Sequence, residues 1–189
     1  MPMEKIEKIE KECEERMKKA LEAVLSDLAG IRTGRASPAL VEKIEVDAYG
    51  GKYTIQELAA ITVPEPRLLI IAPWDKSTLP AIEKAILKSP LGLTPTNDGN
   101  VIKLPFPPLS EDRRKDILKV VAKRIEEGRV AIRNIRRSTN EELEKLEKSG
   151  EASEDDVFRA KERVQKLTDK YIELLNEAQK AKEKEILES

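Results

Sequence analysis

The stretch Leu104-Pro-Phe-Pro-Pro-Leu-Ser110 separates two kinds of sequence and decides how this chain of 189 residues is organised. Pro105, Pro107 and Pro108 fall within four residues. Because proline lacks a backbone N–H and clashes with the preceding helical turn, the stretch cannot continue a helix or a central strand. We therefore expect a boundary here, with short strands before it and a long helix after it.

The sequence after this boundary predicts two long helices. Ser110 is a good cap for a helix that runs to about Lys148. Gly128 lies inside this helix at a cost of about 1 kcal/mol relative to alanine, which indicates close packing or a bend. After Ser149–Ser153, a last helix begins with Ser153 and Asp156 in a pattern like a capping box. The apolar stripe of the helix after Ser110 is Ile117, Val121, Ile125, Ile132, Ile135, Leu143 and Leu146. That of the last helix is Val157, Ala160, Val164, Leu167, Tyr171, Leu174, Ala178 and Ala181.

A third helix of the same kind is predicted at residues 4–29. Its apolar residues alternate at three- and four-residue spacing: Ile6, Ile9, Cys13, Met17, Ala20, Val24 and Leu28. Cys13 lies on this stripe, so we interpret it as a packed thiol. Since no single helix can bury its own stripe, we predict a three-helix bundle formed by residues 1–30 and 105–189.

Residues 31–104 lack the helical period and predict a small inserted α+β domain of the β/α/β type. Tyr49-Gly-Gly51 and Asp98-Gly99 are turn signals, and Trp74 is expected in the core of this domain. The predicted strands are Ile44–Ala48, Ile61–Val63, Leu68–Ala72 and Val101–Leu104, and the predicted helix is Leu79–Leu87. The fold class is therefore α+β, mainly α, with the small domain inserted between the first and second long helices.

Two chain segments, residues 30–36 and 104–109, cross between the predicted domains. We expect them to run side by side as a hinge and the molecule to be elongated. The candidate hinge residues are Gly30, Arg32, Thr33, Gly34, Arg35, Pro105, Pro107 and Pro108.

Composition excludes several classes of function. The formal net charge is −1, so no global basic field attracts nucleic acid. Histidine is absent, which removes the commonest general base and the commonest transition-metal ligand. The single cysteine fits a reducing compartment. No apolar run approaches 18 residues and the N-terminus does not resemble a signal peptide, so we expect a cytoplasmic protein without a membrane segment.

Positive charge is concentrated in Arg129-Val-Ala-Ile-Arg-Asn-Ile-Arg-Arg137. In a helix its four arginines share about a third of the circumference, and no acidic residue lies between Glu127 and Glu141. Phosphate from a partner could supply the missing negative charge, because guanidinium groups bind it bidentately. Alternatively, the arginines form a solvated helix face or pair with acids on another helix.

Several motifs, in the right order along nearly the whole chain, resemble the ribosome recycling factor family. They are Ile31–Leu40, Pro73–Ser77, Ile82–Ile86, Leu91–Leu93, Asn97–Gly99, Arg113–Lys115, Arg129–Arg137 and Gln165–Ile172. The resemblance implies an L-shaped molecule that binds large-subunit ribosomal RNA at the subunit interface. It also implies that elongation factor G and GTP hydrolysis act with the factor to separate the subunits, which releases messenger RNA and deacylated transfer RNA.

The resemblance further implies site residues and excludes covalent chemistry by the factor itself, so no cofactor or metal is expected. Arg136 is the first candidate for an RNA backbone contact, with Arg129, Arg133 and Arg137 beside it. For Arg32 and Arg35 a local role and an RNA contact both remain open. A coiled-coil interaction module whose basic helix face meets an acidic protein is the main alternative. An enzyme is disfavoured, since no phosphate-binding loop or metal-ligand cluster is present. We expect a monomer.

Overall fold

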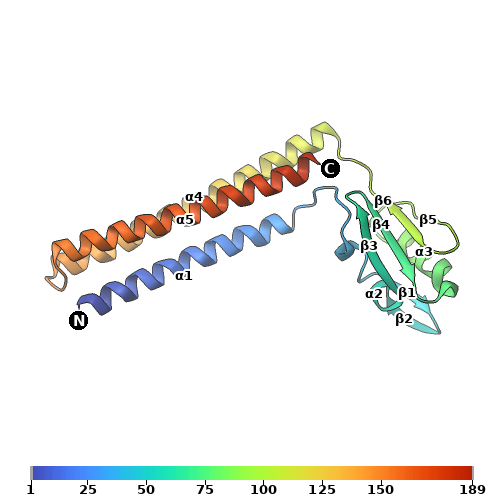
Figure 1. Ribbon diagram of the computed structural model, residues 1–189, viewed down its shortest axis with the longest axis horizontal. Helices are drawn as coiled ribbons and strands as arrows, with labels where there is room; N and C mark the ends of the chain where they lie inside the picture. Colours follow the sequence, from blue (N-terminus) through green and yellow to red (C-terminus); the bar gives the residue numbers. More distant parts are fainter. Residues whose placement is uncertain (1, 189) are drawn as a thin grey trace. The chain divides into compact units, whose positions relative to one another are not determined.

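The computed structural model describes residues 2–188, which form a mainly helical α+β fold in two compact units (Figure 1). The first unit combines the chain up to Ile31 with Asp112–Leu187, and the second includes Arg32–Glu111. None of the helices in the described part of the chain is long and apolar enough to cross a membrane.

Three long helices make up the first unit: α1 (Pro2–Ala29), α4 (Glu111–Lys148) and α5 (Glu154–Leu187). The bounds of α1 and α4 and the start of α5 lie within two residues of those expected from the sequence. The end of α5 was not predicted. Ser153 caps α5 as expected, since its hydroxyl accepts a hydrogen bond of 3.1 Å from the backbone N–H of Asp156.

Series of buried residues spaced 11 apart run along each of these helices, beside other buried residues spaced seven apart. Eleven residues make three turns of 3.67 residues each, close to the 3.6 of a straight helix, so one face stays buried along the whole length. In α5, Thr168 and Leu175 are therefore buried. Of the expected heptad positions, Leu167, Leu174 and Ala178 are only partly buried and Ala181 is exposed. The 11-residue series include Ile6, Met17 and Leu28 in α1, Val121, Ile132 and Leu143 in α4, and Val164, Leu175 and Ile186 in α5.

Gly128 marks close packing, and α4 continues through it to Lys148. A Cβ atom at this position would lie 2.8 Å from Cγ2 of Val24 and 3.3 Å from the methyl groups of Leu175. Gly128 therefore lets α4 approach both α1 and α5.

Cys13 is buried in the bundle, as the apolar stripe predicts. Burial raises the pKa of its thiol above the ordinary value of 9.0, although a hydrogen bond with Thr139 acts in the opposite direction. Such a thiol is a packing residue and a poor nucleophile.

The second unit contains two antiparallel sheets and short helices. Strands β1 (Glu45–Ala48) and β2 (Gly51–Thr54) form a hairpin, and the other sheet has the strand order β3-β4-β6-β5. The remaining elements are η1 (Pro38–Leu40), α2 (Ile55–Leu58), β3 (Ala59–Glu65), β4 (Leu68–Pro73), η2 (Lys76–Thr78), α3 (Leu79–Lys88), β5 (Thr96–Asn97) and β6 (Ile102–Pro105).

Strand β2 and helix α2 were not predicted, although both have local signals in the sequence. Tyr49 and Gly50 have φ angles of 52° and 76°, as a two-residue hairpin turn requires, so β2 must follow directly. Thr54 and Glu57 stand three residues apart, and the Thr54 N–H donates to the Glu57 carboxylate over 3.2 Å, which is a capping-box contact at the start of α2.

One apolar core fills this unit. Ile82 and Ile86 of α3 pack with Leu69 and Ile71 of β4, and Val46 brings the hairpin into the same core. The Pro-rich segment also belongs here: the Phe106 N–H donates to the Arg67 carbonyl over 2.8 Å, and the Phe106 ring packs against the core. The unit therefore extends past Leu104.

The expectation that Trp74 lies in the core was wrong, since its side chain is 68% exposed. Alternation along β4 explains this result. Leu69 and Ile71 point into the core, so the residues between them, and by the same alternation Trp74, point to the opposite side.

Candidate nucleic-acid interface

The four arginines of the candidate site project from the middle of α4, beside its buried stripe. Helix α5 runs along this side of α4 (Figure 1), and side-chain hydrogen bonds from Arg129 and Arg136 reach it. The surroundings of the four side chains differ, and these differences determine which guanidinium groups are available to a partner.

Arg129 is bound within the bundle. Its guanidinium group donates to Asn176 Oδ1 over 2.8 and 3.0 Å, to Gln179 Oε1 over 2.9 Å and to Glu126 Oε2 over 3.0 Å. The side chain is only 22% exposed. Arg129 therefore connects α4 to α5, and little of its hydrogen-bonding capacity remains for an external ligand.

Arg136 is held at one end only. Its Nη1 donates to Gln165 Oε1 of α5 over 3.1 Å, while its Nε has no hydrogen-bond partner among the described residues. Because the partner is a neutral amide, the contact orients the guanidinium group without neutralising its charge.

Arg133 and Arg137 are freer. The Arg133 side chain is 44% exposed and its nearest acid, Glu126, lies 3.9 Å away at the limit of an ion pair. Arg137 is exposed and forms no hydrogen bond or ion pair with other described residues. The sequence-based alternative that acids on another helix pair with the arginines is therefore not what residues 2–188 show.

One further positive charge between α4 and α5, that of Lys161, is neutralised inside the protein. The Lys161 ammonium donates to Glu144 Oε1 over 2.9 Å, and this hydrogen bond holds the pKa of the Glu144 carboxyl below its ordinary value. Lys161 is therefore not available to an external anion, in contrast to Arg133, Arg136 and Arg137.

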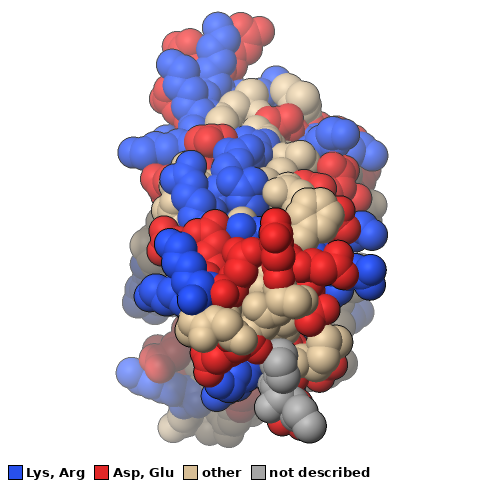
Figure 2. Space-filling model, turned by 90° about the vertical axis from the view of Figure 1, so that its left-hand side faces the viewer, with Lys and Arg blue, Asp and Glu red and all other residues tan. Residues whose placement is uncertain are grey.

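The end of the bundle where α4 joins α5 has mixed charge, with Lys and Arg side chains around a central acidic group (Figure 2). Figure 2 shows Asp and Glu side chains gathered in the middle of this end face. Glu154, Asp155 and Asp156 occupy the first turn of α5, where negative charge stabilises the helix N-terminus.

Sequence reasoning missed the α5 amides that orient the arginines. Gln165, Asn176 and Gln179 lie one to four residues from buried positions of α5, where polar residues flank a packed stripe. Gln165 also begins the motif Gln165–Ile172, but nothing in the sequence indicated the partners of the three amides, which required the packed helices.

The candidate hinge residues have mixed environments. Thr33 is buried and Arg32 is exposed, while Arg35 is partly buried. Gly34 has φ 80°, and a Cβ atom there would lie 2.8 Å from Cγ of Leu109, so the two predicted segments touch at this glycine. Gly30 donates its N–H to the Ser26 carbonyl over 3.2 Å and ends α1. Pro105 is the last residue of β6, and Pro107 and Pro108 follow it outside regular structure.

The residues described by the structure include no group of three His, Cys, Asp or Glu side chains that could hold a metal ion.

Comparison with known proteins decides the family. Residues 24–187 match the family model described as "Ribosome recycling factor". The chain belongs to the ribosome recycling factor family. The ribosome-recycling factor of Symbiobacterium thermophilum is 57% identical over 178 residues, which cover 94% of this chain and 96% of the relative. The ribosome-recycling factor of Carboxydothermus hydrogenoformans is 54% identical, and the match covers 96% of this chain and 98% of the relative.

Solved structures of ribosome recycling factors are also similar. A solution structure of a ribosome recycling factor is 49% identical, covers 97% of this chain and 98% of its own, and has a TM-score of 0.69. A second structure is 44% identical, with coverages of 96% and 98% and a TM-score of 0.61. It represents models of the T. thermophilus ribosome recycling factor and E. coli elongation factor G bound to the E. coli post-termination complex.

Proposed function

We propose that this chain acts as a translation factor that binds the ribosome after the finished peptide is released. Together with elongation factor G and GTP, it separates the subunits, so that messenger RNA and deacylated transfer RNA leave. Family membership supports this proposal. So does the similar T. thermophilus factor that is described together with elongation factor G on a post-termination complex. The factor contributes binding and geometry, and it makes or breaks no covalent bond.

Arg133, Arg136 and Arg137 then contact backbone phosphates of large-subunit ribosomal RNA at the subunit interface. The observation that carries this assignment is the charge balance. Two of the three arginines have no acidic partner within the described chain, and the third has only a distant one. An external polyanion supplies the missing charge and can bind each guanidinium group through two hydrogen bonds.

Arg129, the fourth candidate, has a different role in this proposal. Its bonds to Asn176 and Gln179 fix α5 against α4 and so set the positions of the other arginines. We expect Arg129→Ala to lower the free energy of unfolding by about 1–3 kcal/mol, because charged hydrogen bonds are lost. The loss is measured by urea unfolding. Arg137→Ala should stay within about 0.5 kcal/mol. Equal midpoints for the two variants would contradict this division of roles.

The RNA contact is tested by measuring binding to 70S ribosomes across a salt series. We expect Arg133→Ala with Arg136→Ala to weaken binding and to make the salt dependence shallower by about two phosphate contacts, because each contact releases condensed counterions.

Arg159→Ala is the matched control. Arg159 is also on the bundle but is 67% exposed and paired with Asp155 one turn away. It should leave affinity and salt slope unchanged. If the double variant binds as tightly as the wild type, or if Arg159→Ala weakens binding equally, the RNA contact lies elsewhere. Tight binding of an acidic protein without ribosomes would favour the interaction-module alternative.

A further inference from the structure

The hairpin strand β1 has an unpaired backbone edge. Ala48 pairs with Gly51 next to the two-residue turn, and the register continues to Glu45 opposite Thr54. In such a hairpin the hydrogen-bonded pairs alternate, and the Ile55 N–H bonded to the Ile44 carbonyl over 3.1 Å fixes which pairs they are. The N–H and C=O groups of Glu45 and Asp47 therefore point away from β2.

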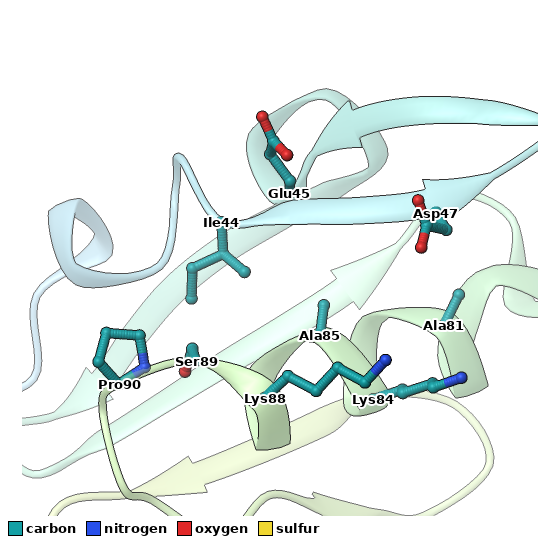
Figure 3. A pocket seen from close by; sticks show the side chains of 9 residues that line it. All are labelled: Ile44, Glu45, Asp47, Ala81, Lys84, Ala85, Lys88, Ser89 and Pro90. Atoms are coloured by element: carbon teal, nitrogen blue, oxygen red, sulfur yellow. The ribbon is translucent and has the colours of Figure 1, made fainter.

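A groove of about 540 Å³ lies along this edge, between β1 and α3 (Figure 3). Ala81 and Ala85 of α3 face the groove, and their small side chains leave room above the helix. Figure 3 shows Ala85 directed toward β1, with Ile44 and Pro90 at one end. Among the described residues, the backbone groups of Glu45 and Asp47 that point to this side have no hydrogen-bond partner.

The two walls of the groove carry opposite charges. Glu45 and Asp47 are on the strand, and Lys84 and Lys88 are one turn apart on α3. Both lysines are exposed and neither forms an ion pair within the described chain. Glu45 has only a distant partner, Lys52, at 4.0 Å.

We propose that an extended segment of a partner protein adds to β1 as a third strand of the hairpin sheet. Its backbone pairs with the free N–H and C=O groups of Glu45 and Asp47, as in β-strand addition. Side chains alternate along an extended chain. Basic residues of the segment therefore lie beside Glu45 and Asp47, while acidic or small apolar residues lie over Lys84, Lys88 and the alanines.

The charges select this occupant over two others. Nucleic acid would place phosphates beside the Glu45 and Asp47 carboxylates, which repel them. A second copy paired through the same strand would set the acidic side chains of one β1 opposite those of the other, and like charges directly opposite destabilise a sheet.

The test is an NMR titration of the full chain, labelled with ¹⁵N, with the peptide Ac-Lys-Glu-Lys-Val-Lys-Glu-NH2. When extended, this peptide presents lysines on one face and Glu-Val-Glu on the other. We expect the amide signals of Glu45 and Asp47 to shift and their hydrogen exchange to slow. The scrambled peptide Ac-Lys-Lys-Glu-Glu-Val-Lys-NH2 has the same composition but no segregated faces, so it should bind at least tenfold more weakly.

Two proline variants separate backbone pairing from charge attraction. Asp47→Pro removes an N–H that points into the groove and is not used by β2, so it should weaken peptide binding at least tenfold. Lys52→Pro is the matched control. Lys52 stands opposite Asp47, and its N–H points to the other edge of the hairpin. This variant should bind the peptide as the wild type does, and the unbound spectra of both should show an intact core.

Several results would overturn the proposal. They are the absence of peptide binding, equal binding of the scrambled peptide, shifts confined to residues outside β1 and α3, and equal loss in both proline variants. Self-association of the chain that Asp47→Pro abolishes would assign the edge to a second copy and would also overturn it.

Discussion

The close approach of the three long helices depends on the absence of a side chain at residue 128. A methyl group there would lie 2.8 Å from Val24 and 3.3 Å from Leu175, so α1, α4 and α5 meet at one glycine. The local helix preference opposes this choice, because alanine is favoured over glycine in a helix by about 1 kcal/mol. Packing therefore outweighs propensity at this position.

We expect Gly128→Ala to destabilise the bundle, although it improves local helix propensity. Overpacking a close-packed site costs about 1–3 kcal/mol, which exceeds the gain of about 1 kcal/mol from propensity. Urea unfolding followed by circular dichroism at 222 nm measures the difference.

Val24→Ala provides the matched background for this experiment, since it removes the Cγ2 atom that the new methyl group would meet. In the Val24→Ala background, Gly128→Ala should lower the free energy of unfolding by less than it does in the wild type. The double-mutant cycle then gives a favourable coupling energy. A stabilised Gly128→Ala single variant would show that the helices relax without cost and would refute the packing argument.

The segments that connect the two units are the elements on which we expect recycling to depend. We propose that residues 30–36 and 104–109 act as the hinge. Gly34 requires a left-handed backbone and touches Leu109, whereas Gly30 has no positive φ and would place a Cβ atom at an ordinary 3.5 Å from the Asp27 carbonyl.

We expect Gly34→Ala to slow subunit separation more than it weakens binding to 70S ribosomes. The left-handed backbone costs a non-glycine residue about 1–2 kcal/mol, and the contact with Leu109 adds to this strain. The proposed RNA contacts, by contrast, are on α4 and are untouched. Light scattering with elongation factor G and GTP measures separation, and sedimentation measures binding.

Gly30→Ala controls for the added methyl group and should change neither quantity. If Gly34→Ala reduces separation and binding in the same proportion, the segment serves only to hold the structure and the hinge assignment fails.

Each unit of the molecule buries its own apolar residues. The helical unit buries the stripes of α1, α4 and α5 against one another, and the second unit has a separate core that includes Val46, Leu69 and Ile82. Neither unit needs a second chain to cover a continuous apolar stripe.

We therefore expect a monomer of 21.3 kDa in sedimentation equilibrium at micromolar concentrations. The physical reason is that the three stripes already satisfy one another within one chain. A mass that rises toward twice this value with concentration would contradict the prediction. It would also indicate that a helix face exposed here is covered by another copy.

Local sequence signals located most elements because helix stripes, caps and turns depend on neighbouring residues. Tyr49-Gly50 predicted its turn and Ser153 predicted the start of α5. The same signals, read as motifs in order, indicated the family that the comparisons establish. The basic stretch of α4 was also evident, because its arginines and the lack of acidic residues between Glu127 and Glu141 can be counted directly in the sequence.

Only the packed structure decided which residues each interface uses. Heptads and 11-residue repeats differ by a fraction of a residue per turn, so the burial of Leu175 in place of Leu174 depends on how three long helices pack together. The separation of Arg129 from Arg133, Arg136 and Arg137 likewise depends on Asn176, Gln179 and Gln165, which lie 29 to 50 residues away in the chain. Contacts between distant segments follow from the geometry of the whole unit, and no local pattern encodes them.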